Sequence, residues 1–143
     1  ADASNNGDNG INLQLNGGSE AADFWLSDLQ AANNGANGIN IAENFSSTVR
    51  VGGERIVAPN NTGNGVRIVN DGVGPVPVFD FGGGTLGSLG YSSIYGNGNR
   101  DFRYVNGGGN TVSAQSNWWG VGGGTFAGGV DHSNPLSSDP NAP

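Results

Sequence analysis

The sequence predicts an all-β protein, a short parallel β-helix of about four coils in which each coil corresponds to one repeat of the sequence. Related segments rich in Asn and Gly begin at Asn5, Asn33 and Asn60, which are 28 and 27 residues apart. Each segment leads into residues that alternate apolar and polar side chains with a period of two, as half-buried strands do. A regular spacing of this length is typical of a solenoid.

The composition is typical of a protein with a thin core. Hydrophobic residues make up 34% of the 143 residues, charged residues only 12%, and Gly alone accounts for 28 residues. The low charge and the clusters of β-branched residues argue against disorder. Each coil of a solenoid buries only a few apolar residues against its neighbours, so a small apolar fraction is sufficient.

One strand of each coil follows the Asn- and Gly-rich turn. A fourth copy of the repeat lies 36 residues after the third, and the Gly-rich residues 82–90 are expected to form the insertion that lengthens this coil. The apolar pairs are Ile11/Leu13, Ile39/Ile41, Val66/Ile68 and Phe102/Tyr104, and the intervening Asn12, Asn40, Arg67 and Arg103 are expected to face solvent.

Two further strands are expected in each coil, which makes the coil triangular. The second strands align residues 24–26, 49–51, 79–81 and 112–114, and the third strands contain residues 29–31, 56–58 and Ile94. Residues 19–32 also fit a helix, because Ser19 can cap it and residues 20–22 are helix formers. Their alignment with residues 49–51 favours the strand.

One Asn occupies an equivalent place in each turn, five residues before the first strand residue. Stacked coils would bring these side chains to about 4.8 Å from one another. Their amides can then hydrogen-bond along the stack. We therefore expect a structural asparagine ladder of Asn6, Asn34, Asn61 and Asn97, and a second column of Asn16, Asn44 and Asp71.

The parallel β-helix is expected to span residues 1–120, and residues 121–143 are expected to form an irregular C-terminal tail or cap rich in Gly, Pro and Ser. Trp118 and Trp119 end the repeats and are expected to cap the last coil. Residues 1–4 align with residues 29–32, so the chain is expected to begin inside a coil with an uncapped edge. The tail either covers its own coils or reaches a neighbouring copy.

Charge and motifs argue against several classes of function. A net charge of −7 with five Arg and no Lys offers no basic face to a nucleic acid. No apolar run approaches the roughly 18 residues of a membrane span, so no membrane insertion is expected. No carboxylate pair, nucleophile motif or metal-ligand cluster emerges, so we expect no catalytic residue, no metal and no cofactor. For His132, near Asp131 and Asp139, a solvated tail residue is preferred to a metal ligand.

Three outward residues form the candidate contact surface: Trp25, Arg67 and Arg103. Trp25 is expected to face solvent between two inward apolar residues, and an exposed Trp indicates contact with a partner, a sugar ring or another loop of the chain. Arg67 and Arg103 are neighbours in the stack, without a column of acids beside them. Solvated arginines are therefore preferred to the charge-neutralising group of a lyase.

Three segments show a resemblance to known proteins: FDFGGGTLGS at residues 79–88, SIYGNG at 93–98 and VSAQSNWWG at 112–120. They resemble the DLGGG turn, the NxIYxN strand and turn, and the A..NWWG final coil of bacterial secreted proteins in the pectin-lyase-like superfamily. The resemblance covers most of residues 5–120 and implies right-handed coils and an extracellular or cell-surface location. The superfamily includes lyases, hydrolases, adhesins, phage spikes and surface repeats, and the fold does not choose among them.

Three functions are therefore open at this point. The preferred hypothesis is a non-enzymatic extracellular structural β-solenoid that assembles head-to-tail with copies of itself into a filament or scaffold. The alternative is a truncated cell-surface adhesin or glycan-binding module whose partner is a polysaccharide. A remnant of a polysaccharide lyase is the third, and we expect no enzymatic activity.

Overall fold

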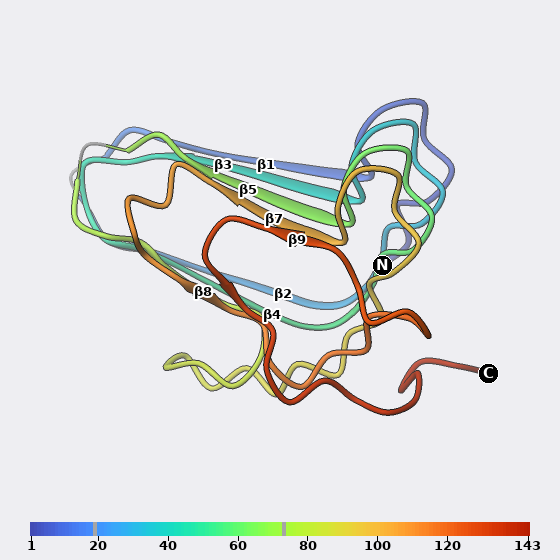
Figure 1. The fold of residues 1–143 in the computed structure, drawn as a ribbon. Coiled ribbons are helices and arrows are strands. Elements are labelled where there is room, and N and C mark those ends of the chain that lie inside the picture. Colours follow the sequence, from blue (N-terminus) through green and yellow to red (C-terminus); the bar gives the residue numbers. More distant parts are fainter. Residues whose placement is uncertain (19, 73) are drawn as a thin grey trace.

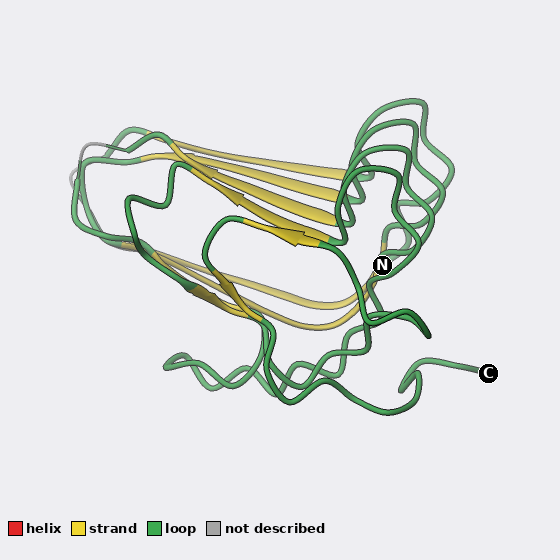
Figure 2. Cartoon of the chain, in the orientation of Figure 1, coloured by secondary structure: helices red, strands yellow, loops and turns green. Residues whose placement is uncertain are grey.

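The computed structural model is a β-solenoid of about four turns and describes residues 1–18, 20–72 and 74–143 (Figure 1). Parallel strands stack in two five-stranded sheets, with the orders β1-β3-β5-β7-β9 and β10-β8-β6-β4-β2. None of the described residues is helical, so this part of the chain has no helix that could cross a membrane (Figure 2). The predicted all-β solenoid is confirmed.

The first sheet contains the strands that follow the Asn-rich turns. Its strands are β1 (Ile11–Asn16), β3 (Ile39–Asn44), β5 (Val66–Asn70), β7 (Phe102–Val105) and β9 (Phe126–Ala127). The register places Ile11, Ile39, Val66, Phe102 and Phe126 in one column. This is the column that the repeat spacing predicts, with Phe126 as an additional fifth member.

The second sheet contains β2 (Ala22–Gln30), β4 (Val49–Val57), β6 (Val78–Asp80), β8 (Val112–Ser113) and β10 (Val130–Asp131). Phe24 pairs with Val51, and Val51 pairs with Phe79. The predicted alignment is therefore wrong by two residues from 24–26 to 49–51 and from 49–51 to 79–81. It is right from 79–81 to 112–114, where Asp80 pairs with Ser113. A shift of two residues keeps every side chain on its own face of the sheet, so the alternating pattern does not distinguish the two registers.

The predicted third strands are not separate in the first two coils. β2 and β4 are each nine residues long and include most of these residues. The chain turns the corner within these strands, at Asp28 and Arg55, whose φ angles of 53° and 50° are left-handed. A helix over residues 19–32 is wrong, because residues 22–30 form β2, and Ser19 lies outside the described residues.

The core lies between the two sheets and changes character along the solenoid. Ile and Val fill the middle coils, and aromatic rings fill the C-terminal ones. Trp119 is 3% exposed and packs edge-to-face between Phe102 and Phe126, with ring centroids 6.3 and 4.8 Å away. Trp118 is partly buried and packs against Tyr95 at 4.6 Å. Of the two predicted cap residues, Trp119 is therefore a core residue and Trp118 contacts the neighbouring coil.

The tail continues the solenoid before it folds back on it. β9 and β10 extend both sheets beyond residue 120, and the ring of Phe126 stacks on His132 with centroids 3.8 Å apart. Ser93 donates a hydrogen bond to Asp139, and Asn141 Nδ2 donates to the Tyr91 carbonyl at 3.0 Å. Pairing therefore extends past the boundary predicted at residue 120, and the tail covers coils of its own chain.

Candidate functional site

The four predicted ladder residues are joined by a continuous chain of hydrogen bonds. The Oδ1 atom of Asn34 accepts from the backbone N–H and Nδ2 of Asn6, at 2.9 and 3.2 Å. Asn61 Oδ1 accepts the same two bonds from Asn34, both at 2.9 Å. Asn97 Oδ1 accepts from Asn61 at 2.9 and 3.0 Å. Each coil therefore donates to the next one along the chain, and the ladder has a direction.

The ladder ends at the carboxylate of Asp101. Asn97 donates its backbone N–H and Nδ2 to Asp101 Oδ1, at 3.2 and 2.8 Å. The other oxygen, Oδ2, accepts from the N–H and hydroxyl of Thr125 at 2.8 and 3.0 Å. Asp101 thus joins the last ladder Asn to the residues just before β9. At the opposite end, no described residue donates to Asn6 Oδ1.

A second Asn ladder, not predicted from the sequence, lies on the same turn. Asn37 donates Nδ2 and its N–H to Asn9 Oδ1 at 2.7 and 3.2 Å. Asn64 donates to Asn37 Oδ1 in the same way, at 2.6 and 3.0 Å. These bonds run in the direction opposite to the first ladder. The three residues occupy equivalent places in the aligned repeats, and that constant position was the available signal.

The three residues of the predicted contact surface are divided between the two sheets. Trp25 lies on β2, and Arg67 and Arg103 lie on β5 and β7 as register partners. The Arg67 guanidinium donates to Asn40 Oδ1 at 2.9 Å, and Asn40 donates to Asn12 Oδ1 at 2.9 Å. The arginines therefore belong to a polar column on one sheet and do not share a surface with Trp25.

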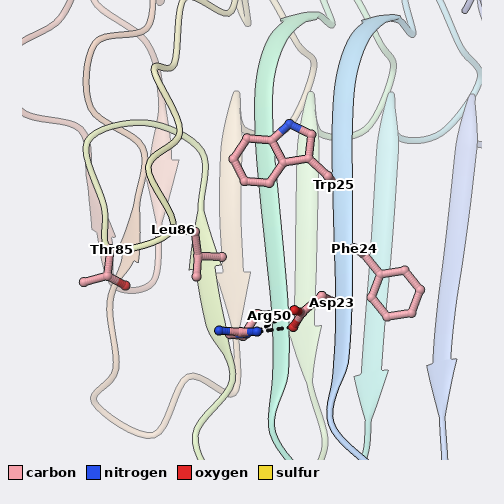
Figure 3. Close-up of a pocket in the computed structure, with 6 residues that line it drawn as sticks. All are labelled: Asp23, Phe24, Trp25, Arg50, Thr85 and Leu86. Carbon is pink, nitrogen blue, oxygen red and sulfur yellow. Dashed lines mark hydrogen bonds and ion pairs between the residues drawn. The ribbon is translucent and has the colours of Figure 1, made fainter.

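Trp25 lies beside a groove on the outer face of the second sheet (Figure 3). Its side chain is 48% exposed, while the neighbouring Phe24 and Leu26 pack against the core. The indole lies over Gly52, its register partner on β4. A Cβ atom at residue 52 would lie only 2.0 Å from the indole Cζ3, so the ring can occupy this position only because residue 52 is Gly.

The groove encloses about 360 Å³ and combines aromatic, charged and apolar groups. Arg50 and Asp23 are register partners and form a bidentate ion pair, with Nε–Oδ1 and Nη2–Oδ2 distances of 2.7 and 2.5 Å. This hydrogen bonding lowers the pKa of Asp23 below its ordinary value and raises the pKa of Arg50. Both side chains are largely exposed, so the pair contributes polarity to the groove rather than stability.

One wall of the groove is formed by the insertion at residues 82–90, and a buried carboxylate holds this insertion in place. Thr85 and Leu86 come from the insertion at residues 82–90, and Asp80 beside it is 0% exposed. Asp80 Oδ1 accepts backbone N–H bonds from Gly82 and Gly84, both at 3.0 Å. Its Oδ2 accepts from Leu86 at 2.9 Å and Ser88 at 3.3 Å. The sequence pattern did not assign Asp80 this role, although an acid before a Gly-rich run is a signal for a cluster of backbone donors.

Comparisons with models of protein families, with curated proteins and with solved structures find no match to this chain. Its function is therefore inferred from its own residues and their geometry.

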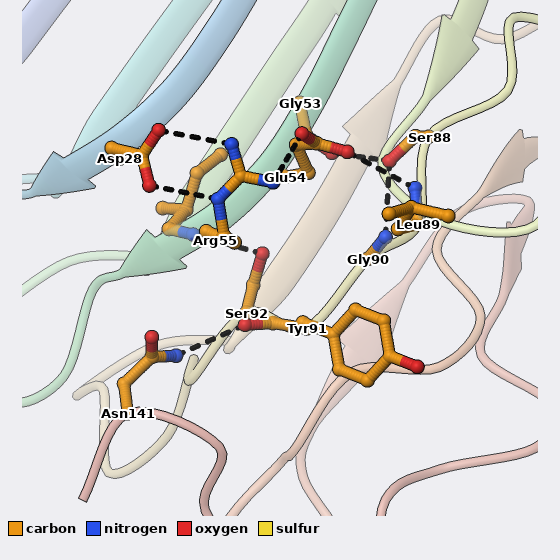
Figure 4. A network of polar contacts seen from close by, with 11 residues as sticks. Asp28, Gly53, Glu54, Arg55, Ser88, Leu89, Gly90, Tyr91, Ser92 and Asn141 are labelled. Carbon is orange, nitrogen blue, oxygen red and sulfur yellow. Dashed lines mark hydrogen bonds and ion pairs between the residues drawn. The ribbon is translucent and has the colours of Figure 1, made fainter.

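A second polar network joins the corner of the first two coils to the same insertion (Figure 4). Arg55 donates to both oxygens of Asp28, at 2.7 and 2.9 Å, and to Glu54 Oε1 at 2.5 Å. Glu54 Oε2 accepts the N–H of Leu89 at 3.2 Å. Hydrogen bonding to Arg55 lowers the pKa of Asp28. Both acids are paired with a cation, so this network positions the insertion instead of supplying a free general base.

Metal binding has no candidate in the described ranges 1–18, 20–72 and 74–143. They contain no group of three or more His, Cys, Asp or Glu side chains arranged to hold an ion. His132 lies against Phe126, with the planes of the two rings at 3° to each other. Asp131 accepts hydrogen bonds from Ser133 and Gln115, which lower its pKa.

Proposed function

We propose that this chain is a non-enzymatic structural β-solenoid that stacks on further copies of itself to form an extracellular or cell-surface scaffold. The repetition of the coil-to-coil contact supports this proposal. The same columns join β1 to β3 and β3 to β5, with Ile11, Ile39 and Val66 in one column and the Asn ladder in another. Because successive coils present similar faces, the face that accepts one coil suits another coil of the same kind.

The exposure of the first coil supports a contact there. β1 and β2 are the edge strands of their sheets in the described chain. Ile11 and Leu13 are partly exposed, whereas their partners Ile39 and Ile41 are fully buried. A coil placed over this edge would pair its backbone groups and bury apolar surface, which stabilises by about 25 cal/mol per Å².

The last coil, which contains β9 and β10, offers less backbone for pairing than the first coil, and this limits the expected strength of the contact between copies. β9 and β10 have only two residues each, and the Asn ladder ends at Asp101 instead of presenting a free amide. A head-to-tail contact would therefore depend mainly on short backbone pairing and on apolar burial. We expect association that depends strongly on protein concentration.

The stacking proposal predicts different effects from charges at two adjacent residues of β1. Leu13→Lys places an inward-pointing charge on the edge and should abolish growth of particles with concentration, measured by sedimentation velocity and electron microscopy. Asn12→Lys is the matched control, because residue 12 points away from the core on the same strand. Circular dichroism checks that both variants keep their β structure. An unmodified chain that stays monomeric at high concentration would refute the stacking proposal.

The Trp25 groove favours a second function, binding of a neutral sugar residue of a glycan. One face of an indole suits the apolar C–H face of a sugar ring, and the nearby carboxylate and guanidinium suit its hydroxyl groups. Asp23 and Arg50 neutralise each other, which favours a neutral sugar over a uronate. Asp23 is the single carboxylate among the described lining residues, whereas glycoside hydrolysis ordinarily uses two. Binding without cleavage is therefore the expected activity.

The groove proposal predicts loss of glycan binding when the indole is removed or displaced. Trp25→Ala should abolish retention of the chain in affinity electrophoresis with neutral polysaccharides. Gly52→Ala should also weaken it, because the new Cβ would collide with the ring while Trp25 itself is unchanged. Leu89→Ala is the control, since Leu89 is 59% exposed and lies outside the groove lining. Retention that is equal in all four proteins, or absent in the unmodified chain, would exclude the sugar site.

A further inference from the structure

Eight Asn–Gly peptide bonds occur in the chain. They differ in whether the backbone N–H of the Gly donates a hydrogen bond. In such a sequence the Gly nitrogen can attack the side-chain Cγ of Asn. A C–N bond forms, ammonia leaves, and a succinimide ring results. Water then opens the ring to aspartate or isoaspartate. The reaction needs a Gly nitrogen and an Asn side chain that are free to meet, and the lack of a Cβ on Gly allows their close approach.

In six of the eight pairs the Gly N–H donates to a carbonyl of a neighbouring coil, at 2.8 to 3.1 Å. The six donors are Gly10, Gly17, Gly35, Gly38, Gly65 and Gly98. In five of these pairs the Asn side chain is also held in one of the two ladders, and these residues are Asn9, Asn34, Asn37, Asn64 and Asn97. Attack on Cγ would require both sets of hydrogen bonds to open. The ladders therefore protect their own amides from this chemistry.

Asn106–Gly107 is different. Asn106 follows β7, is exposed and has a left-handed φ of 60°. Among the residues that the structure describes, none accepts a hydrogen bond from the Gly107 N–H. The side chain is held by one bond, from Nδ2 to Asp71 Oδ1. We propose that Asn106 is a site of spontaneous deamidation, at which the folded chain acquires aspartate or isoaspartate before the ladder asparagines do.

Asn6–Gly7 is the nearest competitor. The Gly7 N–H also has no acceptor among the described residues. However, Asn6 Nδ2 donates both to the Ala3 carbonyl at 2.9 Å and to Asn34 Oδ1 at 3.2 Å, which fixes its amide in the turn. Asn6 is therefore expected to react after Asn106.

Conversion at Asn106 changes a contact between two coils. The amide donates to Asp71, which lies near the end of the preceding strand of the same sheet, β5. A carboxylate at residue 106 would face the Asp71 carboxylate, and two like charges at this distance repel. The modification therefore opens the link between the ends of β5 and β7 and adds one negative charge.

The experiment follows the unmodified chain at mildly alkaline pH by peptide mapping with mass spectrometry, and identifies isoaspartate with an isoaspartyl methyltransferase. Asn106 is expected to convert about tenfold or more faster than Asn9, Asn34, Asn37, Asn64 and Asn97, since freeing the bonded Gly N–H of these pairs costs at least one hydrogen bond. In the chain unfolded in urea, all eight bonds should convert at similar rates. Asn106→Gln should remove the fast site. Equal rates for Asn106 and Asn34 in the folded chain, or an unchanged Asn106 after the unfolded chain has converted, would overturn the proposal.

Discussion

Replacement of Asn61 by alanine is expected to lower the free energy of unfolding by about 3–5 kcal/mol, because it breaks the buried ladder at its middle. Asn61 is 1% exposed and accepts two bonds from Asn34. Its own N–H and Nδ2 bond to Asn97, and the alanine variant loses the Nδ2 bond. Each buried group that is left without a partner costs about 1–3 kcal/mol. Urea unfolding followed by circular dichroism measures the difference.

Asn6→Ala is the matched control for this prediction, because Asn6 is exposed at the open end of the same ladder. The alanine variant loses the Nδ2 bonds, but its backbone N–H still donates to Asn34 Oδ1, so the expected cost is about 1 kcal/mol or less. A similar loss of stability in both variants would mean that the ladder amides do not contribute through burial.

Replacement of Asp80 by alanine is expected to cost about 3–5 kcal/mol and to release the wall of the groove. Its carboxylate is fully buried and accepts four backbone N–H groups of the insertion, from Gly82, Gly84, Leu86 and Ser88. Without it, these donors lose a shared charged acceptor. Urea unfolding measures the loss, and limited proteolysis should show new cleavage within residues 82–90.

Asp23→Ala tests whether that effect belongs to Asp80 alone. Asp23 lies in the same groove but is exposed in its ion pair with Arg50, so its replacement should leave the free energy of unfolding almost unchanged. This variant should retain the protease resistance of residues 82–90. If Asp80→Ala leaves that resistance unchanged, the carboxylate does not hold the insertion.

The stacking and sugar-binding proposals are compatible in their geometry. Trp25 projects from the outer face of β2, whereas a second copy would contact the strand edges (Figures 1 and 3). Stacked copies would present several Trp25 side chains along one assembly. Several weak sites on one particle bind a polymer more tightly than one site does, provided that their spacing matches the polymer.

The sequence alone was sufficient for the features that recur in every coil. Constant spacing predicted the column of Ile11, Ile39, Val66 and Phe102 and placed the ladder Asn residues in equivalent turns. The exposure of Trp25 followed from the alternation of its strand. Such features follow from the repeat spacing, because stacking brings equivalent residues of successive coils into contact.

The tertiary structure decided the features that occur once or that depend on register. A two-residue shift leaves the alternating pattern unchanged, so only packing between coils selects the pairing of Trp25 with Gly52 instead of Arg50. Asp80 and the insertion have no repeated counterpart, and their bonds join residues whose contact no spacing predicts. The tail is similar, since Phe126 packs against the core where it contacts Trp119 and pairs with Phe102. Contacts of this kind depend on the shape of one particular surface, which periodicity does not encode.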